Sequence, residues 1–261
     1  MKLAIYQMEV QAGVPDENRK KVQHWLREVA VKHRPDVAVL PEMWTTGYAL
    51  PDLEEIADDE FGETLTFLKP LAKEYKMDII AGSIAVKTKG GIVNRALTIS
   101  KKGELIHTYD KIHLVPMLDE PRYLVGGKEK VTTYDLHGTT MGSLICYDLR
   151  FPEISRTLAL QGAKVIVVMG EWPAARREQW DALLRARAIE NQCFIVAAGA
   201  VGGHNGTNYS GHSTVISPWG KIIELADAEK EETLIANIDL TEVNEFRTAV
   251  PTFESREPSL Y

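Results

Sequence analysis

The sequence predicts an α/β layered fold, in which a mixed sheet or a pair of sheets is covered by helices. Short apolar runs alternate with longer segments whose apolar residues recur at helical spacing. This alternation occurs in both halves of the chain, and hairpin-like runs interrupt it. A chain of 261 residues is a common length for one domain of this class, so residues 1–261 are expected to form a single domain.

The first half of the chain contains five apolar runs with strand character, at residues 3–8, 37–40, 78–84, 92–99 and 103–109. A helix is expected at residues 16–33, where Val22, Leu26 and Val29 recur at helical spacing, and a second helix at residues 60–76. The long loop at residues 110–130 is expected to be functional, because loops of this length are uncommon inside a compact domain.

The second half repeats this theme. Strands are expected at residues 140–145, 164–169 and 193–200, and a helix at residues 176–191. The remaining apolar runs, at residues 210–217, 221–225 and 233–238, have the pattern of antiparallel strands.

The composition is ordinary for a globular protein, with 44% hydrophobic and 26% charged residues. The net charge of −7 argues against nucleic acid as a partner, because phosphate binding needs a basic surface. Two cysteines, Cys146 and Cys193, are too few for a disulfide framework. The first residues lack the pattern of a signal peptide, and no apolar run reaches the roughly 20 residues of a membrane span. We therefore expect a cytoplasmic protein with reduced thiols.

Cys146 is placed where a nucleophile would be expected. An apolar strand leads directly into it, and Pro152 then favours the start of a helix. A nucleophile on a strand-to-helix turn projects above the sheet, beside free backbone N–H groups. The start of a helix also favours thiolate over thiol. Taken alone, a buried structural role is the commoner one for a free cysteine, and it is the role we assign to Cys193, which lies inside an apolar strand.

Two further strands end at reactive residues, Glu42 and Lys111. Ligands of open α/β sheets bind at the carboxyl ends of the strands, so these residues would meet Cys146 if the three strands are parallel neighbours. A carboxylate near a thiol can accept its proton, and a lysine can stabilise the thiolate and later an oxyanion. Each charge alone is better explained as solvated, but together the three residues are suited to acyl transfer.

Three segments then carry a family resemblance. They are Leu40-Pro41-Glu42-Met43, Tyr109-Asp110-Lys111-Ile112-His113-Leu114 and Ile145-Cys146-Tyr147-Asp148-Leu149-Arg150-Phe151-Pro152-Glu153. In this order and at these distances they resemble the nitrilase superfamily of carbon–nitrogen hydrolases, and the likeness extends from the first strand to about Asp239. The resemblance implies a four-layer αββα sandwich.

The resemblance also implies the roles of the reactive residues. Cys146 would be the acylated nucleophile, Glu42 the general base and Lys111 the oxyanion stabiliser, with the backbone N–H of Tyr147 sharing the oxyanion. A second active-site glutamate is expected shortly after the lysine, and Glu120 matches that position, with Asp119 as the competing assignment. No metal or organic cofactor is implied, and the sequence has no zinc-type Cys/His cluster.

The form of the cysteine motif resembles the omega-amidase and deaminated-glutathione amidase branches. The segments 172–180 and 184–192 resemble the bacterial omega-amidases, which deaminate 2-oxoglutaramate or related 2-oxo acid amides. Such a carboxylate-bearing substrate would need a cation, and Arg binds carboxylates in a bidentate manner, which makes Arg150 and Arg176 candidates. Ion pairing of Arg150 with Asp148 or Glu153 is equally plausible. Tyr48 and Trp172 are candidates for lining the pocket, although core packing is the commoner role of a lone tryptophan.

Several alternatives remain open at this stage. Within the class they are a deaminated-glutathione amidase, an N-carbamoyl amino acid amidohydrolase and, least favoured, a true nitrilase. In another class, the chain would be a catalytically silent scaffold. The presence of all three of Glu42, Lys111 and Cys146 argues against this alternative. A thiol redox protein would normally carry Cys-x-x-Cys, which is absent. The expected partners are a small amide, water and a second copy of the chain, on which the tail at about residues 240–261 would pack.

Overall fold

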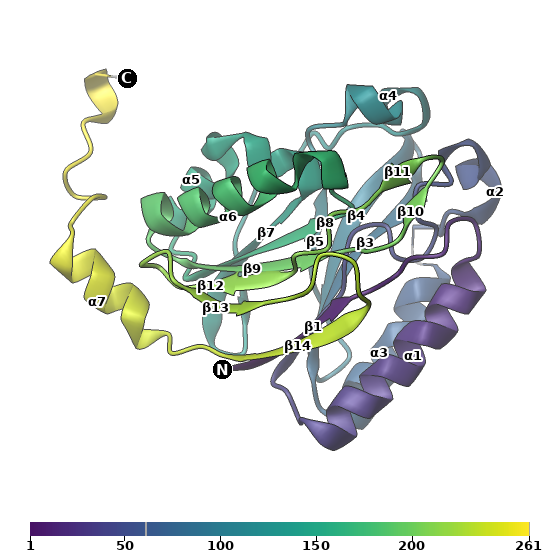
Figure 1. Ribbon diagram of the computed structural model, residues 1–261, viewed down its shortest axis with the longest axis horizontal. Coiled ribbons are helices and arrows are strands. Elements are labelled where there is room, and N and C mark those ends of the chain that lie inside the picture. Colours follow the sequence, from purple (N-terminus) through teal and green to yellow (C-terminus); the bar gives the residue numbers. More distant parts are fainter. Residues whose placement is uncertain (61, 261) are drawn as a thin grey trace.

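The computed structural model describes residues 1–60 and 62–260, and its centre consists of two six-stranded sheets packed face to face (Figure 1). The first sheet has the strand order β14-β1-β2-β3-β4-β5. Its strands are β1 (Lys2–Gln7), β2 (Val37–Val39), β3 (Asp78–Thr88), β4 (Gly91–Ile99), β5 (Leu105–Asp110) and β14 (Glu232–Asn237). Phe61, inside the expected helix 60–76, and Tyr261, in the expected tail, lie outside the described residues.

The second sheet has the order β13-β12-β9-β8-β7-β6. Its strands are β6 (Tyr134–Leu136), β7 (Thr139–Ile145), β8 (Val165–Gly170), β9 (Phe194–Gly199), β12 (Thr214–Ile216) and β13 (Ile222–Leu225). The strands β7, β8 and β9 are parallel, and antiparallel strands flank them on both sides. A separate two-stranded hairpin is formed by β10 (Gly203–His204) and β11 (Thr207–Asn208).

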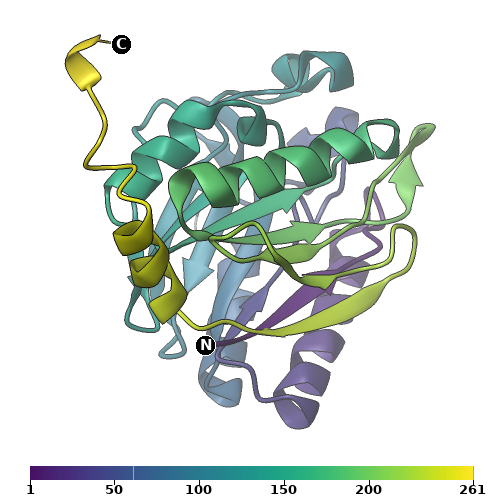
Figure 2. The ribbon, with the colours of Figure 1, turned by 60° about the vertical axis from the view of Figure 1, so that its left-hand side comes forward.

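Helices cover the outer face of each sheet, so the expected αββα sandwich is confirmed (Figure 2). The first sheet is covered by α1 (Pro15–Lys32) and α3 (Glu63–Tyr75), and the second by α5 (Pro152–Leu160) and α6 (Arg177–Asn191). Successive side chains of β1 point to opposite faces of the first sheet, and each face contributes to a different core. Leu3 and Ile5 belong to the core shared with the second sheet, whereas Ala4 and Tyr6 belong to the core beneath α1 and α3.

Short helices occupy the connections, several of them near the ends of strands. They are α2 (Leu53–Ile56) and α4 (Glu120–Tyr123), with the 3-10 helices η1 (Leu50–Asp52), η2 (Pro116–Leu118), η3 (Cys146–Arg150), η4 (Ala174–Arg176) and η5 (Pro258–Leu260). The predicted long loop at 110–130 therefore contains η2 and α4. Among the described residues, no helix is both long and apolar enough to cross a membrane.

Two expectations about the second half need correction. The strand expected at residues 210–217 is shorter, because Gly211 and His212 adopt positive φ angles of 56° and 50° and the strand begins only at Thr214. The C-terminal segment also contains a helix, α7 (Thr241–Ala249), that the sequence reading did not anticipate. Val243 and Phe246 of this helix are buried against their own chain, whereas most residues after Val250 are exposed.

Candidate active site

Glu42, Lys111 and Cys146 come together at one end of the sandwich, but from different sheets. Glu42 follows β2 and Lys111 follows β5, which are separated by β3 and β4 in the first sheet, whereas Cys146 follows β7 in the second sheet. The condition of three parallel neighbouring strands is therefore not met, although the three residues do come together. The residues meet because the two sheets are stacked, so that strand ends from both sheets border the same interior space.

Lys111 lies at the centre of this cluster and is fully buried. Its Nζ donates to Glu42 Oε1 at 2.9 Å and to Glu120 Oε1 at 2.7 Å. Burial disfavours the charged amine, but the two carboxylates more than offset this effect, so the pKa of Lys111 lies well above its ordinary value. Lys111 therefore remains a cation inside the site.

The carboxylate of Glu42 is held by donors from three further segments. Oε1 accepts from Asn94 Nδ2 at 2.9 Å and from the Tyr48 hydroxyl at 3.1 Å. Oε2 accepts from the backbone N–H of Glu171 at 2.8 Å. The carboxylate is thus fixed in orientation, and Oε2 retains a lone pair that can receive a proton.

The surroundings of Asp119 and Glu120 differ, and they favour Glu120 as the second glutamate of the site. Glu120 is fully buried, and its Oε1 also accepts from the Tyr48 hydroxyl at 2.6 Å while Oε2 accepts from the Val115 N–H at 2.7 Å. Burial raises the pKa of Glu120, although the charge of Lys111 opposes the rise. Asp119 is exposed and adopts a φ of 59° at the start of α4.

The turn that carries Cys146 is fixed by Asp148, two residues further on. The buried Asp148 carboxylate accepts from the Tyr109 hydroxyl at 2.8 Å and from the backbone N–H of His113 at 3.0 Å. His113 Nδ1 lies 2.8 Å from the same carboxylate. These contacts tie the cysteine turn to the segment that carries Lys111. Cys146 has a φ of 47°, and Tyr147 is the second residue of η3, whose first N–H groups have no acceptor within the helix.

The ionisation of Cys146 differs from the sequence-based expectation. Burial and the charge of Glu42 raise the pKa of the Cys146 thiol well above its usual value, and the nearby Lys111 only partly counteracts them. The expectation that the helix start would favour thiolate is therefore wrong for the resting site. A buried thiol beside a carboxylate requires proton transfer to the carboxylate during nucleophilic attack.

The candidate substrate-binding residues Tyr48, Arg150, Trp172 and Arg176 have different surroundings. Tyr48 lines a cavity of about 150 Å³ together with residues of η1, α4 and the β10–β11 hairpin. Arg150 donates to Gln179 Oε1 at 2.8 Å and stacks over the Trp172 ring at 4.6 Å, and it forms no ion pair with Asp148 or Glu153. Trp172 is buried, as core packing would require, and its Nε1 donates to the carbonyl of Arg176. The half-buried side chain of Arg176 has no hydrogen-bond partner among the described residues.

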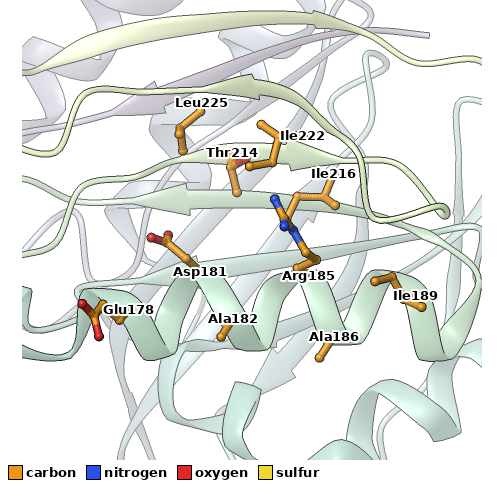
Figure 3. Close-up of a pocket in the computed structure, with 10 residues that line it drawn as sticks. All are labelled: Glu178, Asp181, Ala182, Arg185, Ala186, Ile189, Thr214, Ile216, Ile222 and Leu225. Atoms are coloured by element: carbon orange, nitrogen blue, oxygen red, sulfur yellow. The ribbon is translucent and has the colours of Figure 1, made fainter.

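A further cavity, of about 690 Å³, lies away from this cluster (Figure 3). It is a groove on the outside of the second sheet, between α6 and the strands β12 and β13, and Arg185 extends across it from the helix. None of the predicted catalytic residues lines this groove. Cys193, assigned to the core, is fully buried, and burial raises the pKa of its thiol to about 12.

Three residues of the site were not found from the sequence: Asn94, Glu171 and Tyr209. Asn94 is a buried polar residue inside the apolar strand β4, and Glu171 follows β8 directly, as Glu42 closely follows β2. A carboxylate at the end of an apolar strand was therefore the available signal for Glu171. Tyr209 gave no signal, because it follows a short hairpin and approaches Glu171 only through the tertiary fold.

Within residues 1–60 and 62–260, no group of three or more His, Cys, Asp or Glu side chains is arranged to hold a metal ion. The chemical groups at hand in the cluster are a buried thiol, three carboxyl groups and one ammonium group. This set can perform nucleophilic acyl transfer with proton transfer through Glu42 and charge stabilisation by Lys111.

Comparison with known proteins identifies the same family that the sequence motifs resemble. The carbon-nitrogen hydrolase family matches residues 2–248. The chain is 41% identical over 262 residues to "Hydrolase in agr operon" of Staphylococcus aureus, covering 100% of both chains. It is 40% identical over 260 residues to "2-oxoglutaramate amidase" of Bacillus subtilis, covering 99% of this chain and 98% of the relative.

A solved structure supports the family at the level of the fold. The CN-hydrolase superfamily protein XC1258 from Xanthomonas campestris, which has an arsenic adduct in its active site, superposes with a TM-score of 0.91 at 29% identity. The superposition covers 98% of this chain and 97% of the other. The sequence motifs, the αββα sandwich and these matches agree, and the chain belongs to the carbon–nitrogen hydrolase family of the nitrilase superfamily.

Proposed function

We propose that this enzyme hydrolyses the terminal amide of a small carboxylate-bearing amide, as an omega-amidase acting on 2-oxoglutaramate or a related 2-oxo acid amide. The observation that carries the proposal is the buried cluster in which Lys111 bridges Glu42 and Glu120 beside the thiol of Cys146. The relative named 2-oxoglutaramate amidase supports the substrate class.

In the first half of the proposed reaction, the Cys146 thiol gives its proton to Glu42 as the sulfur attacks the amide carbon. The C–S bond forms, and the former carbonyl oxygen becomes an oxyanion that Lys111 Nζ and the Tyr147 N–H stabilise. Glu42 returns the proton to the nitrogen, the C–N bond breaks and ammonia leaves. A thioester on Cys146 remains.

In the second half, Glu42 removes a proton from water, and the resulting hydroxide attacks the thioester carbon. A second oxyanion forms in the same position, the C–S bond breaks and the sulfur recovers the proton from Glu42. The carboxylic acid product leaves. Glu120 orients Lys111 through both steps, because its carboxylate accepts from the same ammonium group as Glu42 does.

The substrate carboxylate requires a cation, and Arg176 is the better of the two arginine candidates. Arg150 is engaged by Gln179 and by the Trp172 ring, whereas the side chain of Arg176 is uncommitted among the described residues. Tyr48 lines the cavity next to Glu42 and is placed to contact the acyl chain. Trp172 Nε1 donates to the carbonyl of Arg176 and so helps to fix the position of this residue.

Ammonia release from 2-oxoglutaramate, succinamate, deaminated glutathione and an N-carbamoyl amino acid tests the proposal. We expect turnover of 2-oxoglutaramate or succinamate that is abolished in Cys146→Ala, and a raised KM for succinamate with little change in kcat in Arg176→Ala. Preference for deaminated glutathione or the carbamoyl compound would move the substrate assignment. Activity that survives in Cys146→Ala would reject the cysteine mechanism, and no turnover of any compound would favour the scaffold alternative.

We also propose a homodimer that works in the cytoplasm. The residues after Val250 are mostly exposed, with Leu260 at 80%, and the groove beside α6 is lined by Ile216, Ile222 and Leu225. Light scattering should give twice the chain mass of 29.2 kDa, and a single-chain mass would reject the dimer. A free catalytic thiol needs a reducing compartment, so recovery of the activity outside the cell would contradict the cytoplasmic location.

A further inference from the structure

Glu171 is a buried carboxyl group that the proposed reaction does not use. Its side chain is fully buried, and neither carboxyl oxygen has a partner with regular hydrogen-bond geometry, although the Tyr209 hydroxyl lies near the carboxyl group. A buried carboxylate without well-aligned donors is strongly disfavoured, whereas the neutral acid is tolerated. The burial of Glu171 therefore needs an explanation beyond packing.

The charges around Glu171 also favour its neutral form. Its backbone N–H donates to Glu42 Oε2, which places the side chain beside a carboxylate. The charged groups that act on it are Glu42, Lys111 and Glu120, and the Tyr209 hydroxyl lies close to it. Burial and then the charge of Glu42 raise the pKa of Glu171 well above its usual value, and Tyr209 and Lys111 oppose this only in part.

Glu171 also stands next to the space that a substrate would enter. Tyr209 lines the cavity of about 150 Å³, as does Tyr48, and the two rings lie 6.4 Å apart. Tyr48 contacts Glu42, and Tyr209 adjoins Glu171, so the two carboxyl groups lie behind the same pair of rings. An acyl chain whose amide carbon reaches Cys146 would pass near the Glu171 carboxyl.

We propose that Glu171 is a specificity-determining residue, which stays protonated and donates a hydrogen bond to an oxygen of the substrate's acyl chain. This proposal rests on the proposed amidase function, and it identifies the recognised group as a keto or carboxylate oxygen of the amide. A neutral acid attracts such an oxygen, whereas an ionised Glu171 would repel it. The residue thus selects amides with a polar acyl chain over amides with an apolar one.

The first test compares Glu171→Gln, which stays neutral at every pH and keeps a donor, with Glu171→Leu, which has none. Near pH 7, Glu171→Gln should retain most of the wild-type kcat/KM for succinamate. Glu171→Leu should lose about 10- to 100-fold, mainly in KM, as expected when a buried hydrogen bond to a substrate is lost. Butyramide, which has no second oxygen on its acyl chain, should be hydrolysed equally by both variants.

The pH profile separates this role from a merely structural one. As pH rises, wild type should lose activity on succinamate before Glu171→Gln does, because only wild type acquires a charge at this position. Loss of all activity in Glu171→Gln near pH 7 would overturn the proposal, since it would mean that an ionised Glu171 is needed. An unchanged preference for succinamate over butyramide in Glu171→Leu would also overturn it.

A second test needs no substrate. Between the unfolded and folded pKa values of Glu171, the folded protein binds more protons at this residue than the unfolded chain does. The free energy of unfolding of wild type should therefore fall as pH rises above about 4.5, relative to Glu171→Gln. Chemical unfolding from about pH 5 to about pH 8 measures this difference, with the exposed Glu178→Gln as the control. A constant difference across this range would show an ionised Glu171 and overturn the proposal.

The two tests distinguish failure of the inference from failure of the proposed function. If wild type hydrolyses the anionic amides and the Glu171 variants behave like wild type, the inference alone is wrong. If wild type hydrolyses none of the amides, the proposed function fails and the substrate contact fails with it, even where the unfolding difference appears.

Discussion

At the scale of single residues, Lys111 is the charge that makes the cluster compatible with burial. It neutralises part of the charge of Glu42 and Glu120, which would otherwise face each other without a cation between them. Breaking a buried ion pair by removing one partner is costly, because an uncompensated charge is left behind. We therefore expect stability and activity to depend on the same ammonium group.

Replacing this residue, in Lys111→Ala, should lower the free energy of unfolding by about 3–5 kcal/mol. It should also lower kcat at least about 100-fold, because a donor to the oxyanion is lost. Urea unfolding and ammonia release measure the two effects. Lys20→Ala removes a lysine whose ion pair with Glu17 is exposed, and it should change neither quantity appreciably. Equal stability of Lys111→Ala and wild type would show that the ion pairs do not hold the site together.

At the scale of elements, the cysteine turn η3 is supported by the neighbouring helix α6. Arg187 of α6 is buried, and its Nε and Nη2 donate to the carbonyl of Leu149 in η3 at 3.2 and 2.8 Å. This carbonyl lies three residues after the nucleophile. The helix thus fixes the turn that aims Cys146, without itself reaching the reacting groups.

Removing this support, in Arg187→Met, should lower the free energy of unfolding by about 2–3 kcal/mol, because hydrogen bonds from a charged donor to a buried carbonyl are lost. It should also lower kcat more than it raises KM, because the turn that carries Cys146 is less firmly held. Arg27→Met, at an exposed position of α1, is the matched control and should change stability by less than about 0.5 kcal/mol. A rate equal to that of wild type would mean that η3 keeps its geometry without Arg187.

At the scale of the whole molecule, the active site depends on the packing of one sheet against the other. Glu42 and Lys111 follow strands of the first sheet and Cys146 follows a strand of the second, so the spacing of the sheets sets the distance between the Glu42 carboxylate and the Cys146 thiol. Val39 of β2 contributes to the core between the sheets. Val29 of α1 is also buried, but it contributes to the outer core beneath the helices.

Two substitutions that create similar cavities separate the effect of lower stability from the effect of a changed spacing between the two sheets. Val39→Ala and Val29→Ala should each lower the free energy of unfolding by about 2–3 kcal/mol, since both remove the same buried methyl groups. Only Val39→Ala should also lower kcat, because only this cavity lies between the sheets. Unfolding curves and initial rates give the comparison. Equal rates in the two variants would show that small changes in the packing between the sheets do not alter the geometry of the active site.

Features that depend only on neighbouring residues could be read from the amino-acid sequence. Strands and helices followed from local periodicity, and Glu42, Lys111 and Cys146 were found because each follows an apolar strand at a short distance. The order of these motifs also identified the family, which the comparisons confirm. Such patterns are local in the chain, so they can be read without knowing how the layers pack.

The contacts between these residues became visible only in the folded structure. It placed Cys146 on a different sheet from Glu42, buried Glu120 beside Lys111 while Asp119 stays exposed, and raised the pKa of the Cys146 thiol. It also brought Glu171 against Glu42 across 129 positions of the sequence. Burial and the positions of charges depend on segments that meet only when the two sheets stack, so no local pattern in the sequence contains them.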